Sequence, residues 1–265
     1  MIWRGAALAR TGDMENRHKK ILNMLAYESA ASVAQLSAAL GVTKETIRKD
    51  LAQLCDSGKI TRIHGGAALS DSIPFQVRKT IAEDEKKCIA IAACDMIRDN
   101  ESIIIESSTT NVLLSAELLK NPGKLQTLTI ITNSIRIALL LELGEKCEKL
   151  YLLGGQTDAE EGNSFGVQTI EALKHFHADK AFLSAAAFDN QLNVTAYKEH
   201  DMLFQREAML CARETYILVN KKKIPSTALF HVCKIEDVTG IITDAIFPEE
   251  QLEKLNKSKT IVISA

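Results

Sequence analysis

The sequence has no long apolar run and no signal-peptide pattern. None of its apolar stretches reaches the roughly 18 residues that a membrane-spanning helix needs, so we expect no membrane partner. Residues 1–13 contain two arginines but no extended apolar segment, and we interpret them as a disordered tail rather than an export signal. Together these absences predict a cytoplasmic protein.

Paired cysteines and nucleotide-binding glycine motifs are also missing. The six cysteines are scattered, with no Cys-x-x-Cys pair and no histidine at zinc-finger spacing, which argues against a bound metal. We expect buried, reduced cysteines, with a redox sensor as the alternative. Because neither Gly-x-Gly-x-x-Gly nor a P-loop lysine occurs, no nucleotide and no other cofactor is predicted.

The chain of 265 residues is long enough for two domains, and 46% hydrophobic residues can form packed cores. The net charge of −2 is uneven, because residues 1–68 carry ten lysines and arginines against six acidic residues. This basic excess favours a polyanion partner such as double-stranded DNA. We divide the chain into the tail 1–13, a basic domain 14–69, a polar linker 70–85 and a larger domain 86–265.

A helix-turn-helix is predicted between residues 33 and 57. Ser32 is suited to cap a short helix that Gly41 ends, and Thr43 is suited to cap the next one. Two helices joined by such a turn place the second in the major groove of DNA. The alternative is an ordinary solvated helix face. The residues expected to face DNA are Thr43, Lys44, Glu45, Thr46, Arg48 and Lys49.

A two-stranded wing is predicted directly after this helix. Ile60 and Ile63 alternate with basic residues, and a Gly-Gly pair then makes a turn. A plain structural hairpin fits the same residues. The wing residues expected to approach the DNA backbone or minor groove are Arg62, His64 and Gly65.

The remainder alternates short apolar runs with amphipathic helical segments. The runs suit the buried strands of a parallel sheet, which predicts an α/β domain with Rossmann-like layers behind a small, mainly α-helical winged domain. The expected strands are 102–106, 128–132, 149–153, 180–186, 215–219, 240–243 and 260–264. The expected helices between them are 110–119, 134–143, 166–175, 200–213 and 249–256.

Polar residues follow several of these strands, where parallel α/β sheets bind ligands. Hydroxyl groups and backbone N–H groups at helix starts can form an anion site, and phosphate is the obvious anion. Taken singly, such residues are more often helix caps or turns. The candidate effector residues are Glu106, Ser107, Ser108, Thr109, Thr110, Thr132, Asn133, Ser134, Gly154 and Gly155.

Two motifs in the N-terminal part resemble the DeoR family of bacterial transcription regulators. They are Val-Thr-x-x-Thr-Ile-Arg-x-Asp-Leu at 42–51 and Arg-x-His-Gly-Gly-Ala at 62–67. The C-terminal part resembles the sensor domain of that family, whose fold is similar to ribose-5-phosphate isomerase. The resemblance implies that 14–69 is a DNA-binding domain and that 86–265 is an effector-sensing and oligomerisation domain. It also implies a repressor of carbohydrate genes, a phosphosugar or related effector, a homodimer or homotetramer, and Lys223 as a further effector residue.

The sensor region departs from the family pattern at several positions. Glu106 stands where the family has Asp, and Ser108 where it has Gly. Gln205 and Asn220 stand in place of Lys and Asp, which removes possible acid–base groups, so we predict that the protein is not an enzyme. Two alternatives stay open: a constitutive DNA-binding regulator with a degenerate sensor, and a phosphosugar isomerase or deaminase fused to a DNA-binding head.

Overall fold

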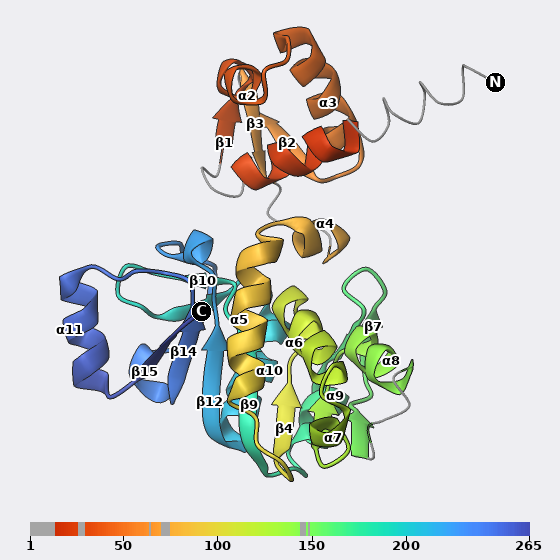
Figure 1. The fold of residues 1–265 in the computed structure, drawn as a ribbon, viewed down its shortest axis with the longest axis vertical. Helices are drawn as coiled ribbons and strands as arrows, with labels where there is room; N and C mark the ends of the chain where they lie inside the picture. The colour runs from red at the N-terminus through yellow and green to blue at the C-terminus, as the bar shows by residue number, and fades with distance from the viewer. Residues whose placement is uncertain (1–13, 26–29, 64, 70–74, 144–146, 148) are drawn as a thin grey trace. The chain divides into compact units, whose positions relative to one another are not determined.

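The computed structural model describes residues 14–25, 30–63, 65–69, 75–143, 147 and 149–265. The chain divides after Ala82 into two compact units, an N-terminal unit and a C-terminal unit (Figure 1). The predicted tail 1–13, His64 and residues 70–74 of the predicted linker lie outside the described residues. No helix in the described ranges has both the length and the apolar character needed to cross a bilayer.

The N-terminal unit is a helical core closed by a three-stranded antiparallel sheet in the order β1-β3-β2. A first helix covers residues 14–25. It is followed by β1 (Ala30–Ser32), α2 (Val33–Leu40), α3 (Lys44–Asp56), β2 (Ile60–Ile63), β3 (Gly66–Leu69) and α4 (Phe75–Thr80). The buried side chains at its centre include Ile21, Leu25, Leu36, Ile47, Leu51 and Leu54.

The helix-turn-helix forms where the sequence predicts it. The Ser32 hydroxyl accepts a hydrogen bond from Gln35 N, and Gly41 ends α2 with a φ of 66°. The Thr43 hydroxyl then accepts from Thr46 N and caps α3. Capping side chains and a left-handed glycine therefore fix both ends of the turn.

The predicted linker 70–85 differs from the structure from residue 75 onward. Phe75–Thr80 form α4, and α5 begins at Glu83. Val77 and Ile81 are buried against the helices of the N-terminal unit. This stretch is polar on average, but its few apolar residues form one face that packs against the other helices of the unit.

Gly66 lies where β3 passes close to β1. A Cβ atom at this position would lie 2.2 Å from the carbonyl oxygen of Ala31 and 2.9 Å from its carbonyl carbon. Because both atoms belong to the backbone of the neighbouring strand, the clash cannot be relieved by a side-chain rotation. The wing therefore depends on glycine at this position.

We expect Gly66→Ala to destabilise the N-terminal unit by about 1–3 kcal/mol through this overpacking. The matched control is Gly65→Ala, since Gly65 has open space around it and only its φ of 75° opposes a side chain. That control should cost about 1 kcal/mol. Urea unfolding of the full chain measures both, and equal losses for the two variants would contradict the clash.

The C-terminal unit is a parallel seven-stranded sheet in the order β15-β14-β12-β9-β4-β5-β6. Every one of the seven predicted apolar runs contributes a strand. The strands are β4 (Ser102–Ile105), β5 (Thr129–Thr132), β6 (Lys149–Leu152), β9 (Ala178–Ser184), β12 (Ala212–Leu218), β14 (Gly240–Thr243) and β15 (Ile261–Ser264).

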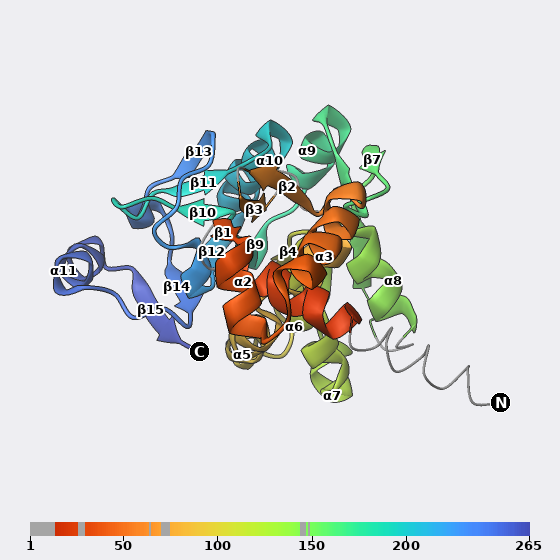
Figure 2. The ribbon, with the colours of Figure 1, turned by 90° about the horizontal axis from the view of Figure 1, so that it is seen from above.

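Helices cover both faces of this sheet. They are α5 (Glu83–Asp95), α6 (Thr109–Leu119), α7 (Pro122–Leu125), α8 (Ile135–Leu143), α9 (Val167–Leu173), α10 (Glu199–Leu210) and α11 (Glu249–Ser258). Ile103 and Ile105 of β4 pack on the side of α5, α6 and α8, whereas Ile104 packs on the side of α9 and α10. Figure 2 shows α9 and α10 across the sheet from α5 and α6. The unit is the predicted layered α/β domain.

The C-terminal unit also contains smaller elements that were not predicted from the sequence. A hairpin pairs β7 (Gln156–Asp158) with β8 (Asn163–Phe165). A separate antiparallel sheet joins β10 (Ala187–Phe188), β11 (Val194–Ala196) and β13 (Phe230–Cys233), and short 3-10 helices η1 and η2 cover Lys221–Lys223 and Ile235–Asp237. These strands are too short, at two to four residues, to show a periodic pattern.

Candidate nucleic-acid interface and effector site

The outer face of α3 presents the residues predicted to face DNA. Its inner face is buried through Ile47, Leu51 and Leu54, which fixes the rotation of the helix. Of the six residues predicted to face DNA here, Thr46 is half-buried and the other five are exposed, namely Thr43, Lys44, Glu45, Arg48 and Lys49. The Thr43 hydroxyl serves as the cap and lies 2.9 Å from the Thr46 hydroxyl. Helix packing therefore leaves a predominantly basic surface turned to solvent.

Arg48 is held only loosely within this surface. Its Nη1 atom lies 3.5 Å from Glu45 Oε2, and both side chains are more than half exposed. An exposed ion pair of this kind contributes less than about 1 kcal/mol to stability. The guanidinium can therefore leave Glu45 and bind a phosphate or a base edge with little loss of free energy.

The wing residue Arg62 contacts the protein itself. Its Nη2 atom donates to the backbone carbonyl oxygen of Arg48 at 2.8 Å, which ties β2 to α3. The side chain nevertheless remains exposed, and a guanidinium has further N–H groups to donate. Gly65 is exposed in the turn between β2 and β3 with a φ of 75°. Arg62 therefore positions the wing as well as adding charge.

Asp50 is a buried carboxylate on the inner side of α3. The sequence identifies it only as a member of the family motif at 42–51. Its side chain is 4% exposed, and Arg17 holds it through two hydrogen bonds of 2.6 and 2.9 Å. His18 Nε2 lies 3.2 Å from the same carboxylate. Both partners lie in the first helix, so this cluster fastens that helix to the recognition helix.

The predicted effector residues lie at the carboxyl ends of the sheet strands. From β4 the chain proceeds through β5 to β6 in one direction, whereas β9, β12, β14 and β15 extend in the other. The boundary between β4 and β9 is therefore the topological switch point, where open α/β sheets bind ligands. Glu106 directly follows β4 at this boundary.

Four residues meet at the switch point, and we call them the switch-point cluster: Glu106, Ser184, Gln205 and Lys223. The Glu106 carboxylate accepts hydrogen bonds from Ser184 N at 2.7 Å and from Gln205 Nε2 at 2.8 Å. Lys223 Nζ donates to the Ala185 carbonyl oxygen, which follows β9, at 2.5 Å. The sequence marked Gln205 only as a departure from the family pattern, and only the fold brings it against Glu106.

Burial raises the pKa of Glu106 to about 8, and the nearby Asp201 carboxylate adds to this effect. The N–H of Ser184, the Gln205 amide and the Lys223 charge oppose the rise. A carboxyl group with a raised pKa at the switch point of a sheet is typical of a functional site.

The start of α6 is shaped by its own side chains. The Ser108 hydroxyl accepts from Asn111 N and caps the helix, and Ser107 N donates to Asn133 Oδ1 at 2.9 Å. Thr109 and Thr110 occupy the first two helical positions, whose N–H groups have no partner within the helix. This N-terminus can therefore attract an anion.

The polar side chains of the loop after β5 mainly make hydrogen bonds within the protein. The Thr132 hydroxyl donates to the Ile105 carbonyl oxygen, and Ser134 N donates back to the Thr132 hydroxyl. Asn133 Nδ2 donates to the carbonyl oxygen of Ser164 in β8. These contacts join the β7–β8 hairpin to the carboxyl end of the sheet.

Gly154 and Gly155 follow β6, two strands away from β4. The Gly154 carbonyl oxygen accepts from the Thr169 hydroxyl at 2.7 Å, and a Cβ on Gly155 would lie 2.2 Å from that same hydroxyl. The glycines therefore let α9 approach the end of β6. The structure does not bring them into the switch-point cluster.

Several buried side-chain oxygens near the carboxyl ends lack a hydrogen-bond partner. Asn111 Oδ1, Asn163 Oδ1 and Gln205 Oε1 are of this kind within the described residues. Buried polar atoms are nearly always paired in proteins, so each of these oxygens can accept a hydrogen bond from a ligand or from solvent.

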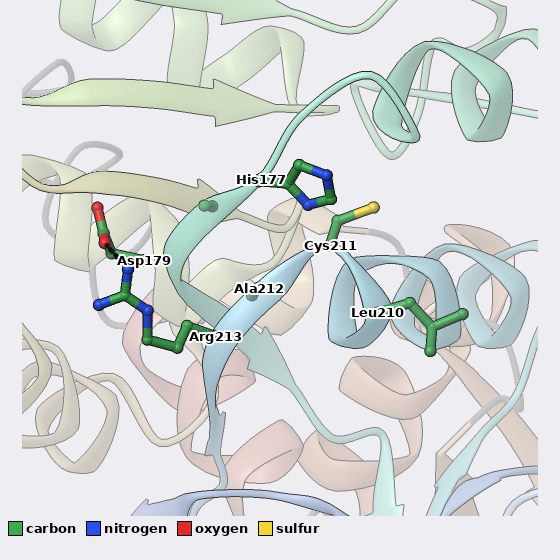
Figure 3. Close-up of a pocket in the computed structure, with 7 residues that line it drawn as sticks. His177, Asp179, Leu210, Cys211, Ala212 and Arg213 are labelled. Atoms are coloured by element: carbon green, nitrogen blue, oxygen red, sulfur yellow. Dashed lines mark ion pairs between the residues drawn. The ribbon is translucent and has the colours of Figure 1, made fainter.

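A cavity of about 260 Å³ lies at the opposite end of the sheet (Figure 3). It is lined by the segments that begin β9 and β12, where Arg213 pairs with Asp179 at 3.4 Å. Burial raises the pKa of the Cys211 thiol in this lining to about 11, so the thiol is not a reactive thiolate at neutral pH. None of the predicted effector residues lines this cavity. In the described part of the chain, no three His, Cys, Asp or Glu side chains are placed to hold a metal.

Comparisons with known proteins agree with both units. The model of the DeoR-like helix-turn-helix domain matches residues 17–73, and that of the DeoR C-terminal sensor domain matches residues 81–245. The chain is 31% identical to the lactose phosphotransferase system repressor of Lactococcus lactis subsp. lactis, over 94% of this chain and 98% of that protein. It is 26% identical to the glycerol-3-phosphate regulon repressor of Escherichia coli, over 90% and 94% of the two chains.

Among solved structures, ribose-5-phosphate isomerase A of Methanocaldococcus jannaschii is similar with a TM-score of 0.40. The two sequences are 19% identical in this match, which covers 54% of each chain. The family models and the full-length relatives are the stronger findings, because they cover both units in order. The chain therefore belongs to the DeoR family of helix-turn-helix transcriptional regulators.

Proposed function

We propose that this chain is a transcriptional repressor of carbohydrate-metabolism genes that a phosphosugar or related metabolite controls. The observation that carries the proposal is the exposed basic face of α3, held on a buried apolar stripe beside a wing. Two relatives are named as repressors, one of a lactose phosphotransferase system and one of a glycerol-3-phosphate regulon. In this proposal α3 enters the major groove of a double-stranded operator, with the wing against the backbone.

The proposed DNA contacts are Thr43, Lys44, Glu45, Thr46, Arg48, Lys49, Arg62, His64 and Gly65. We further propose a homodimer or homotetramer acting in the cytoplasm, since helix-turn-helix dimers read two half-sites one helical turn apart. Light scattering of the full chain, alone and with operator DNA, measures the assembly.

Arg48→Ala is expected to weaken operator binding by about 1–3 kcal/mol if the guanidinium contacts a guanine. The operator is first selected from random DNA by the wild-type chain, and binding is then measured by fluorescence anisotropy at fixed salt. Lys79→Ala is the matched control, because Lys79 is exposed in α4 of the same unit but lies outside α3. Equal losses in the two variants would remove Arg48 from the contact surface.

The proposed effector site is the switch-point cluster with the start of α6. The raised pKa of Glu106, the unpaired Gln205 oxygen and the N-terminus of α6 support this location. Adding single sugar phosphates to the operator complex tests it, because a controlling metabolite must change the measured operator affinity. The same compound must raise the melting temperature of the C-terminal unit.

A second candidate function is constitutive DNA binding with a sensor that no longer responds. The observation in its favour is that Ser184 N and the Gln205 amide already occupy both carboxyl oxygens of Glu106. This candidate predicts an operator affinity and a melting temperature that no sugar phosphate changes. We infer in either case that the unit does not catalyse a reaction, since Gln205 and Asn220 supply no acid or base.

A further inference from the structure

The two units are joined in the chain at the peptide bond between Ala82 and Glu83, which we call the junction. On one side, Ala82 is 3% exposed and belongs to the core of the N-terminal unit, and its N–H donates to Asn23 Oδ1 of the first helix at 3.3 Å. On the other side, Glu83 is the first residue of α5 in the C-terminal unit. The junction therefore connects an anchored residue directly to the start of a helix.

The backbone at the junction has an unusual conformation. Ala82 has a φ of 52°, in the left-handed region that residues other than glycine rarely adopt. Such a conformation persists only where the surrounding structure holds it in place. Ile81 and Ala82 are held by the core of the N-terminal unit, and the residue that follows them is held in α5. We therefore expect a change at the start of α5 to alter the junction.

The start of α5 is held by a lysine of η1. Lys222 Nζ lies 3.5 Å from Glu85 Oε1, and the two side chains are 13% and 27% exposed. Burial alone would raise the pKa of Glu85, but its backbone N–H and the charges of Lys222 and Lys221 hold that pKa below its usual value. Glu85 is therefore ionised at neutral pH, and its contact with Lys222 is an ion pair between η1 and the first turn of α5.

The same short helix reaches the switch-point cluster through its next residue. Lys223 belongs to that cluster, and its Nζ atom donates to the carbonyl oxygen of Ala185 at 2.5 Å. The backbone of η1 is fixed at its start, where Lys221 N donates to Asp244 Oδ1 at 2.7 Å. Because Lys222 and Lys223 share a single turn of 3-10 helix, a displacement of Lys223 also displaces Lys222. The turn therefore has the effector site on one side and α5 on the other.

We propose that the Lys222–Glu85 ion pair transmits the state of the effector site to the junction, and through the junction to the helix-turn-helix unit. An effector that takes Lys223 from the Ala185 carbonyl oxygen shifts η1, which weakens the ion pair and frees the first turn of α5. Lys222 is a positioning residue, because it acts through Glu85 and not on the effector. The proposal rests on the proposed function, since Lys223 is one of the proposed effector residues.

Hydrogen exchange of the full chain without any ligand tests whether the ion pair acts on the junction. In Lys222→Gln, the amides that close the first turn of α5 and the amide of Ala82 should exchange about two- to fivefold faster than in the wild type, as expected for loss of such an ion pair. Lys221→Gln is the matched control in the same turn, because Lys221 pairs with Asp244, and it should leave the Ala82 amide unchanged. Faster exchange in α5 beside an unchanged Ala82 amide in Lys222→Gln would overturn the proposal.

Operator binding with and without ligand tests the transmission itself. The probes are glucose 6-phosphate and glycerol 3-phosphate, each added to the wild type and to Lys222→Gln at fixed salt and pH. An active compound should raise the melting temperature of the C-terminal unit equally in both chains, because Lys222 does not contact it. It should change the operator affinity about fivefold or more in the wild type and about twofold or less in Lys222→Gln. Equal changes of operator affinity in the two chains would contradict the proposed role of Lys222.

Two further variants separate the ion pair from other effects of the substitution. Lys222→Arg keeps the charge and should restore the wild-type exchange and the wild-type response, whereas Glu85→Gln removes the same ion pair from α5 and should reproduce Lys222→Gln even if the latter folds poorly. A wild-type response in Glu85→Gln would show that the ion pair is not the route. If neither compound changes the melting temperature or the operator affinity of the wild type, the effector part of the proposed function loses its support, and the exchange rate of the Ala82 amide still decides whether the ion pair acts on the junction.

Discussion

Asp50→Ala is expected to destabilise the N-terminal unit by about 3–5 kcal/mol and to abolish operator binding. The substitution leaves the Arg17 guanidinium partly buried without the carboxylate that it contacts at 2.6 and 2.9 Å. Removing one member of a buried ion pair costs this much because the remaining charge stays desolvated. A small domain has only about 5–15 kcal/mol of stability in total, so the first helix should separate from α3.

Calorimetry of the full chain measures this loss as a lower melting temperature of the N-terminal unit. Glu45→Ala is the matched control, since Glu45 is an acid on the same helix whose ion pair with Arg48 is exposed. We expect that control to change stability by less than about 1 kcal/mol. If the two variants melted alike, the Asp50 cluster would not be what fastens the first helix.

Asn111→Ala should destabilise the C-terminal unit by about 2–4 kcal/mol. The Asn111 side chain is fully buried, and its Nδ2 atom donates to the carbonyl oxygens of Glu106 and Phe182, both at 2.9 Å. These two carbonyls belong to the ends of β4 and β9. In the variant the Phe182 carbonyl oxygen keeps its hydrogen bond from Glu106 N, but the Glu106 carbonyl oxygen loses the Asn111 donor, and a cavity remains beside it.

Ser115→Ala provides the control on the same helix. The Ser115 hydroxyl is equally buried but donates only to the Asn111 carbonyl oxygen one turn earlier. That carbonyl lies within α6 and can bond along the helix, so its loss should cost less than about 1 kcal/mol. Thermal unfolding of the C-terminal unit distinguishes the variants, and a milder effect of Asn111→Ala than of Ser115→Ala would show that the amide does not join the two strands.

The pattern of apolar residues was sufficient to predict the main elements of both units. The buried stripe of α3 has a period that only a helix satisfies, and short runs such as 102–106 and 240–243 are long enough only for strands. Caps at Ser32 and Thr43 act on backbone N–H groups three residues away, so local sequence suffices to place them. The exposed residues of α3 follow from the same periodicity.

The linker and the accessory strands were harder to predict, for a physical reason. The residues of α4 are polar on average, and their helix is stabilised by a few apolar contacts with distant helices. Strands such as β10 and β11 obtain their hydrogen bonds from partners that are remote in sequence. Neither kind of contact leaves a periodic signal in the local sequence.

The sequence by itself determined the family, the helix-turn-helix and the alternation that builds a layered α/β domain. Only the tertiary structure decided which polar residues meet, because strand order brings Glu106, Ser184 and Gln205 together across 78 and 99 positions of separation. It also decided that Gly154 and Gly155 support packing of α9, whereas Asp50 holds the recognition helix in place. Local patterns set the elements, since their forces act within a few residues, but charge burial depends on the whole fold.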